Sequence, residues 1–281
     1  MCGRKPYYRG MSVTPLQALQ AAARPSSVSG AGAPGPRLLV AGAGGLLGSE
    51  VLQRLIGRPD RAVVQVLACE RLQTGLRGVQ PLIVPTPGAP GGDDFGVWPR
   101  ASAEIGVVMF EPPRNFLGRE RALWTPTPAQ LPALARWMRG SGVRTLAVVL
   151  PHARGRLPEA LKQGLASLDE HALAAMDFER LLIVRSAQLP VAEAAGLGLL
   201  PRLAAWMLDI FKYMVPPAEQ PLRAAKLAEL VELALRIAPP GLHVLPPELL
   251  WRAARGPAEA VLRAWFARAA EAGEPRDKSV A

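Results

Sequence analysis

The sequence has very little cysteine and no long uninterrupted apolar run. Among its 281 residues there are two cysteines, Cys2 and Cys69. So few thiols exclude a disulfide framework and a cysteine-rich metal cluster, and a reducing, cytoplasmic location is the expectation. The stretch nearest to membrane length, residues 195–211, is broken by Pro201 and by two charged residues. No transmembrane helix is predicted, and this stretch reads as a buried or partner-facing helix.

Acidic residues and aromatic residues are also scarce. The chain has 23 Asp and Glu against 33 Lys and Arg, a net charge of +10, and 5% aromatic residues. The basic residues are scattered, without a dense run and without interleaved aromatic side chains, which argues against a dedicated nucleic-acid-binding function. The excess of positive charge favours the attraction of a phosphate-rich ligand.

The first 36 residues contain no acidic residue at all and are rich in Ser, Gly and Pro towards their end. We interpret residues 1–36 as a disordered lead-in. An organelle transit peptide has a similar composition, and an upstream extension with initiation at Met11 is a further alternative.

The chain is organised around a short apolar run followed by closely spaced glycines. Residues 38–41 are apolar, too few for a helix, and lie between a proline and Gly42. From Leu46 the apolar residues recur at helical spacing. Gly42, Gly45 and Gly48 lie where the two periods meet, in the spacing GxxGxxG. A strand, a glycine turn and a helix in this order form the context in which a dinucleotide-binding motif is credible.

Each glycine of the motif has a distinct expected role. Gly42 permits a tight turn, Gly45 permits a pyrophosphate to approach the backbone, and Gly48 permits close packing of helix on strand. The helix N-terminus then offers free N–H groups to the phosphates. The residues predicted to contact the pyrophosphate are Gly42, Gly44, Gly45, Leu46, Leu47 and Gly48. The alternative is an ordinary glycine-rich turn.

The residues that select the dinucleotide are expected at the end of the second strand. This strand is predicted over residues 62–68, about twenty residues after the last glycine, and is followed by Glu70 and Arg71. A carboxylate here accepts from both ribose hydroxyls and favours NAD, whereas an arginine pairs with a 2′-phosphate and favours NADP. The chain offers both, with a slight preference for NADP. A solvated strand end is the alternative.

Apolar segments with strand and helix character alternate through residues 37–185. Strands are predicted over 38–41, 62–68, 79–84, 105–110, 143–150 and 181–184, with helices after the glycine turn, from 127 or 128 to 140, and over 165–175. The pattern predicts an α/β fold, a Rossmann-type doubly wound and mostly parallel sheet.

A small, mainly helical lobe on the substrate side is predicted from about residue 189. Its helices are expected over 199–211 and 222–238, with a short strand at 242–245. The domain prediction is a lead-in over 1–36, a Rossmann domain with its lobe over 37–255, and a C-terminal helix and tail over 256–281.

Ligands of such sheets bind at the carboxyl ends of the strands. Besides the glycine turn, this edge is predicted to carry Phe110 and Glu111 after the fourth strand and Leu150, Pro151 and His152 after the fifth. Residues 185–188 follow the sixth strand. The first four of these residues complete the predicted cofactor contacts.

Three motifs make the chain similar to a known family. These are Gly42-x-x-Gly45-x-x-Gly48, the strand entry over residues 142–149, and the segment 178–185 followed by Gln188-Leu-Pro190. Together they resemble the atypical short-chain dehydrogenases/reductases, near the NmrA-like and Tat-interacting-protein-like branch. The resemblance implies NAD(P) binding and, in many members, reduction or isomerisation of small molecules. Some members have lost catalysis and act as redox sensors or scaffolds.

The catalytic residues that the resemblance implies are missing. Active members have a Tyr four residues before a Lys, but this chain has three tyrosines, Tyr7, Tyr8 and Tyr213, and none stands in a YxxxK pattern. The expected Tyr and Lys positions hold Lys162 and Ala166. The position of the family's serine holds Pro151 or His152.

These observations leave three functional hypotheses. The first is an NAD(P)-binding regulator or a weak, non-classical oxidoreductase whose substrate the sequence does not identify. The second is an active oxidoreductase with a substituted acid: His152 is the weak catalytic candidate, with Glu111, Lys162 and Glu170 near it in the predicted topology. The third is an interaction module whose helices over 199–211 and 222–235 bind a protein partner or a second copy.

Overall fold

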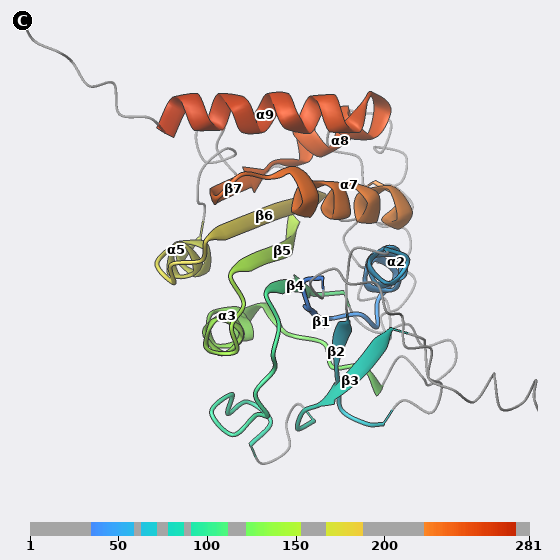
Figure 1. Ribbon diagram of the computed structural model, residues 1–281, viewed down its shortest axis with the longest axis vertical. Helices are drawn as coiled ribbons and strands as arrows, with labels where there is room; N and C mark the ends of the chain where they lie inside the picture. Colours follow the sequence, from blue (N-terminus) through green and yellow to red (C-terminus); the bar gives the residue numbers. More distant parts are fainter. Residues whose placement is uncertain are drawn as a thin grey trace, which may run out of the picture. The chain divides into compact units, whose positions relative to one another are not determined.

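The computed structural model describes residues 35–58, 63–71, 78–86, 91–111, 122–152, 167–187 and 222–273. Its centre is a parallel sheet with the strand order β3-β2-β1-β4-β5-β6-β7 (Figure 1). The strands are β1 Leu38–Ala41, β2 Val64–Ala68, β3 Val79–Ile83, β4 Ile105–Met109, β5 Thr145–His152, β6 Arg180–Ala187 and β7 Gly241–Leu245. This is a Rossmann-type doubly wound α/β sheet, which confirms the predicted fold class.

Helices cover both faces of the sheet (Figure 1). They are α2 Leu46–Ile56, α3 Leu131–Gly140 with the short 3₁₀ turn η2 Pro128–Gln130 before it, α5 Leu168–Ala174, α7 Ala224–Ile237, α8 Pro247–Arg255 and α9 Ala258–Gly273. Alternate residues of β1 serve the two faces: Leu38 and Val40 pack with α2 and α7, and Leu39 and Ala41 pack with α3. β1 is buried on both sides because side chains alternate along a strand, and this explains its continuous apolar sequence.

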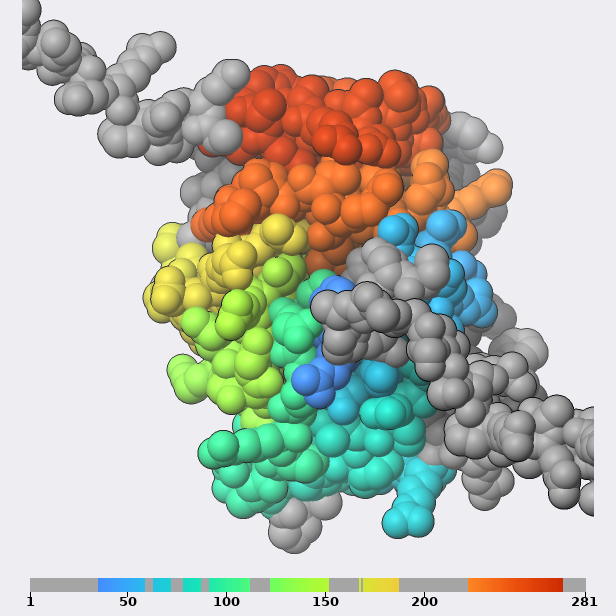
Figure 2. Space-filling view, viewed as in Figure 1, coloured from blue at the N-terminus to red at the C-terminus, as the bar shows by residue number. Residues whose placement is uncertain are grey.

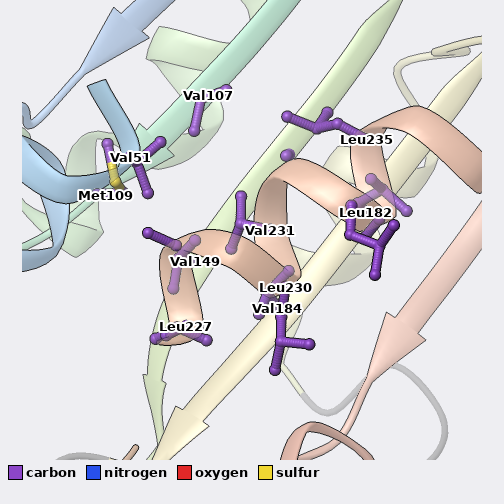
Figure 3. Packing of buried hydrophobic residues seen from close by; sticks show 14 of the residues in the cluster. Val51, Val107, Met109, Val149, Leu182, Val184, Leu227, Leu230, Val231 and Leu235 are labelled. Carbon is purple, nitrogen blue, oxygen red and sulfur yellow. The ribbon is translucent and has the colours of Figure 1, made fainter. Parts of the chain in front are cut away.

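The larger core lies between the sheet and the helices α2 and α7. Figure 3 shows Val51 of α2 beside Met109 of β4, and Val231 of α7 near Val149 of β5. Each fully buried side chain of this kind stabilises the fold by about 1.5–3 kcal/mol. The apolar face of α7 is therefore used inside the chain, and the partner-binding helix predicted at 222–235 has its apolar face covered. The other predicted interaction helix, 199–211, lies outside the described residues.

The C-terminal segment adds a strand to the main sheet. β7 pairs in parallel with β6, from Arg180↔Gly241 to Val184↔Leu245. The described elements also belong to one contact unit, Pro34–Ala281. In Figure 2 the orange and red segment of α7, β7, α8 and α9 packs directly against the yellow segment of β6. The strand predicted at 242–245 is present, and it extends the main sheet.

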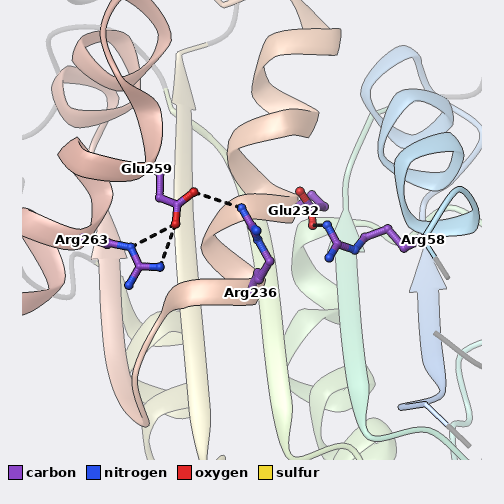
Figure 4. Close-up of polar contacts among 5 residues, drawn as sticks. All are labelled: Arg58, Glu232, Arg236, Glu259 and Arg263. Atoms are coloured by element: carbon purple, nitrogen blue, oxygen red, sulfur yellow. Dashed lines mark hydrogen bonds and ion pairs between the residues drawn. The ribbon is translucent and has the colours of Figure 1, made fainter. Parts of the chain in front are cut away.

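Ion pairs join the helices at the surface (Figure 4). Arg58, just after α2, lies 2.7 Å from Glu232 of α7. Glu259 of α9 contacts Arg263 at 2.7 Å and Arg236 of α7 at 3.4 Å. Hydrogen bonding by Arg263 lowers the pKa of the exposed Glu259 carboxyl. The exposed pairs of Glu259 contribute roughly 0–1 kcal/mol each, so the fold depends mainly on its cores.

Buried His243 makes stability depend on pH. Its Nε2 lies 2.9 Å from the carbonyl oxygen of Pro239, and its ring packs against Phe266. Burial, with a smaller contribution from Arg180, lowers its pKa below the ordinary 6.5. The unfolded chain therefore takes up a proton at a higher pH than the folded chain does, so stability is lost as the pH falls below about 6.5.

We expect the free energy of unfolding from urea titrations to fall between pH 7.5 and pH 5.5 more steeply in the wild type than in His243→Gln. The glutamine amide can still donate to the Pro239 carbonyl but does not titrate in this range. Equal pH slopes for the two proteins would exclude His243 as the source of the effect.

Candidate functional site

The candidate site lies at the carboxyl ends of β1 and β4. From β1 the sheet grows in one direction through β2 and β3 and in the other through β4 to β7. Ligands of open α/β sheets bind at the place where the strand order reverses in this way. The glycine turn and the N-terminus of α2 follow directly after β1 and so lie at this place.

Two glycines of the turn, Gly42 and Gly48, lie so close to neighbouring backbone atoms that a side chain would not fit. Gly42 has a φ of +80°, and a Cβ atom on it would lie 2.0 Å from the carbonyl oxygen of Met109 in β4. A Cβ on Gly48 would lie 2.2 Å from the carbonyl oxygen of Gly42. Both positions therefore require glycine, the first for its backbone angle and the second for the contact between α2 and the end of β1. Gly44, between them, is buried.

A carboxylate occupies the N-terminus of α2. The backbone N–H of Leu47 donates to Oε2 of Glu111 at 2.6 Å. A Cβ on Gly45 would lie 2.4 Å from Cβ of Glu111 and 2.7 Å from the same Oε2. The space that the sequence predicts to be open for a pyrophosphate is thus filled by Glu111, because β4 ends beside the turn and brings Glu111 over Gly45. Leu46, the first residue of α2, is 44% exposed.

An extended segment that the sequence reasoning missed runs along the ends of β1 and β2. The N–H of Gly42 donates to the carbonyl oxygen of Trp124 at 3.1 Å, and the N–H of Trp124 donates to that of Leu67 at 2.9 Å. The backbone N–H of Cys69 donates to the carbonyl oxygen of Ala122. The sequence feature that could have revealed this segment is the large apolar Trp124. It is fully buried and packs edge-to-face on Trp98. The segment fixes the backbone on which the glycine turn begins.

The residues expected to select the dinucleotide lie at the end of β2. Glu70 and Arg71 are both exposed there, and neither preference, NAD or NADP, follows from their placement. Burial raises the pKa of the neighbouring Cys69 thiol, and the negative charge of Glu70 raises it further against the lowering effect of a hydrogen bond with Thr86. A thiol with a raised pKa is a poor nucleophile at neutral pH, so Cys69 is not a catalytic candidate.

The ends of β5 and β6 lie in register with each other. Leu150 pairs with Arg185, Pro151 with Ser186, and His152 with Ala187. Phe110 and Leu150 are half-buried and Pro151 is exposed. The structure thus brings the backbone of His152 to the predicted edge of the sheet. The side chain of His152 and the positions Lys162 and Ala166 lie outside the described residues.

Glu170, considered above as a substitute acid, is engaged in a buried ion pair. Its carboxylate accepts hydrogen bonds from Nη2 of Arg185 at 2.6 Å and from Nε of Arg185 at 3.2 Å. Both side chains are almost fully buried. Ser167 caps the helix α5, accepting from the N–H of Glu170 through its hydroxyl. The Glu170 carboxylate is thus engaged inside the protein by the Arg185 guanidinium, and this contact supports a structural role.

Two further kinds of site are absent from the described part of the chain. No three His, Cys, Asp or Glu side chains gather there in a way that would hold a metal ion. None of the helices described is both long and apolar enough to cross a membrane.

A shallow hollow lined by Ser102, Glu104, Ser141 and Arg144 lies at the amino-terminal edge of the sheet, away from the glycine turn.

Comparisons with known proteins give matches only to solved structures. No family model matches the chain, and no curated protein matches it. The enzyme WbmG of Bordetella bronchiseptica, solved in complex with NAD, is 14% identical with a TM-score of 0.42, over 81% of this chain and 79% of that one. The UDP-Glc/GlcNAc 4-epimerase of Campylobacter jejuni is 12% identical with a TM-score of 0.45, over 78% and 82%. Since these similarities are low, the fold assignment rests on this chain's own strand order.

Proposed function

We propose that the chain binds NAD(P) at the β1–α2 turn and acts as a dinucleotide-dependent regulator or a non-classical oxidoreductase. The observation that carries the proposal is the N-terminus of α2, where the Leu47 N–H already holds an anionic oxygen at the reversal of the strand order. A phosphate needs the same donor and the same end of the helix dipole. Gly42 and Gly48 maintain the geometry of this turn.

The residues that fit a dinucleotide divide into three groups. The turn residues would contact the pyrophosphate, Glu70 and Arg71 would contact the adenosine ribose, and the ends of β4 and β5 would line the nicotinamide side. The proposed contacts are Gly42, Gly44, Gly45, Leu46, Leu47, Gly48, Glu70, Arg71, Phe110, Glu111, Leu150 and Pro151. Arg71 and the resemblance to the family give a slight preference for NADP over NAD.

The absence of a YxxxK pair supports a function other than classical carbonyl reduction. The bound dinucleotide would supply or accept a hydride, but no tyrosine of this chain stands four residues before a lysine. We place the chain nearest to the NmrA-like and Tat-interacting-protein-like branch, which includes members without catalysis, and in a reducing, cytoplasmic setting because it has so few thiols.

The proposal is tested by titrating the purified protein with NADPH and NADH and recording nicotinamide fluorescence and melting temperature. A ligand that binds the folded state at a hundred times its Kd stabilises it by about 2.7 kcal/mol. We expect saturable stabilisation of the wild type and none in Gly45→Glu, whose side chain would enter the space of Glu111 and add a charge to the turn. An unchanged melting temperature of the wild type at millimolar nucleotide would contradict dinucleotide binding.

A further inference from the structure

We propose that Glu111 is a built-in competitor for the pyrophosphate, so that a dinucleotide binds only when this carboxylate leaves the N-terminus of α2. This inference rests on the proposed function and specifies how the same site is controlled. Its basis is the position of one side chain relative to Gly45 and Leu47.

The first step of the argument is the hydrogen bond. Leu47 donates its backbone N–H to Oε2 of Glu111 at 2.6 Å, a short distance for a nitrogen donor and an oxygen acceptor. The N-cap residue Gly45 has no side chain with which to cap, and the first turn of α2 contains no acidic residue. Glu111, from the end of β4, therefore supplies the negative group that favours a helix N-terminus.

The second step is steric. A Cβ atom on Gly45 would point at Glu111: it would lie 2.4 Å from the Cβ and 2.7 Å from the Oε2 of Glu111. In a dinucleotide-binding turn the missing side chain at this position lets the pyrophosphate reach the backbone. Glu111 uses the space that a pyrophosphate needs. The two cannot be present together with Glu111 in this rotamer.

The third step is electrostatic. A pyrophosphate is negatively charged, and a carboxylate beside it at the same N–H donor repels it in a site partly shielded from water. Binding therefore costs the free energy of breaking the contact between Leu47 and Glu111 and of turning the carboxylate away. The form in which Glu111 binds Leu47 does not bind a nucleotide. The more stable this form is, the lower is the apparent affinity of the protein for the nucleotide.

Two variants separate the two effects. Glu111→Gln removes the charge but can still accept from Leu47 and fill the space, whereas Glu111→Ala removes both. We expect the Kd for NADPH to fall about tenfold in Glu111→Ala, equivalent to about 1.4 kcal/mol, and less in Glu111→Gln. The matched control is Glu104→Gln, because Glu104 also accepts a backbone N–H, that of Arg37 at 3.1 Å, at the opposite edge of the sheet. Its Kd is expected to equal that of the wild type.

The experiment measures NADPH and NADH affinities of the wild type and these three variants by nicotinamide fluorescence, with melting curves in the absence of nucleotide to verify folding. Tighter binding in the order Ala, Gln, wild type supports the competitor. Binding by the Glu111 variants alone also supports it, while overturning dinucleotide binding as a function of the native chain. Equal affinity of the wild type and Glu111→Ala overturns the competitor and leaves the proposed function standing. No binding by any form overturns both.

Discussion

Replacing Glu170 by leucine is expected to reduce the free energy of unfolding by about 3–5 kcal/mol. The reason is the environment of its partner: Arg185 is 2% exposed, and its guanidinium binds the Glu170 carboxylate through Nη2 and Nε. Without this carboxylate the buried guanidinium loses a charged partner that binds it through two hydrogen bonds, and breaking a buried pair is costly. A domain has roughly 5–15 kcal/mol of stability in total, so this loss is large. Urea unfolding followed by circular dichroism measures it.

A double variant tests whether the broken ion pair is the cause. Glu170→Leu combined with Arg185→Met replaces the pair by apolar side chains and is expected to recover most of the lost stability, because buried ion pairs are often matched by apolar groups of similar size. Glu229 serves as the control carboxylate: it pairs with Lys226 at 2.8 Å at the surface, and Glu229→Leu is expected to cost less than about 1 kcal/mol. Similar losses for Glu170→Leu and Glu229→Leu would refute the argument from burial.

Replacing Gly48 by alanine is expected to displace α2, lower stability by about 1–3 kcal/mol and abolish nucleotide binding. The added Cβ would lie 2.2 Å from the carbonyl oxygen of Gly42 and 2.7 Å from Cα of Ala43. Both are backbone atoms, so no flexible side chain can move aside. The helix must shift instead, and with it the N–H of Leu47. Differential scanning calorimetry and NADPH titration measure the two effects.

Gly140 provides the matched control for this substitution. It is the last residue of α3, and a Cβ placed on it would meet no atom within 4 Å. Gly140→Ala changes the composition in the same way but is expected to raise stability by about 0.4–1 kcal/mol, because alanine loses less backbone freedom on folding. If both alanine variants melted at the same temperature, the close packing of α2 on the turn would not be what requires glycine at position 48.

Local sequence patterns predicted most of the sheet. Short apolar runs gave β1 and β4 almost to the residue, and Thr127 with Gln130 forms a capping box at the start of η2. The predicted ends of the fifth and sixth strands, at 150 and 184, were too early, since β5 ends at His152 and β6 at Ala187. The ladder explains the difference for β5: β4 pairs with it as far as Val149, and among the described residues β6 is its one neighbour beyond that point, so a proline without an N–H is tolerated.

The arrangement of the site was less accessible to sequence reasoning. The glycines were identified by their spacing, but Glu111 contacts Leu47 across 64 positions, and Glu170 meets Arg185 across 15. Such contacts depend on which strands become neighbours and on where each one ends. The place of β7 in the main sheet has the same origin, since five residues among helices carry no signal of the strand with which they pair.

The central claim, that the β1–α2 turn holds the dinucleotide, is tested most directly by the backbone amide NMR shifts of the protein titrated with NADPH. The account predicts that the largest changes occur at the amides of Gly45, Leu46, Leu47 and Gly48, and that they are larger at equal NADPH in Glu111→Ala. Changes confined to other parts of the chain, such as the hollow near Arg144, or no change at the turn at saturating NADPH, would contradict it.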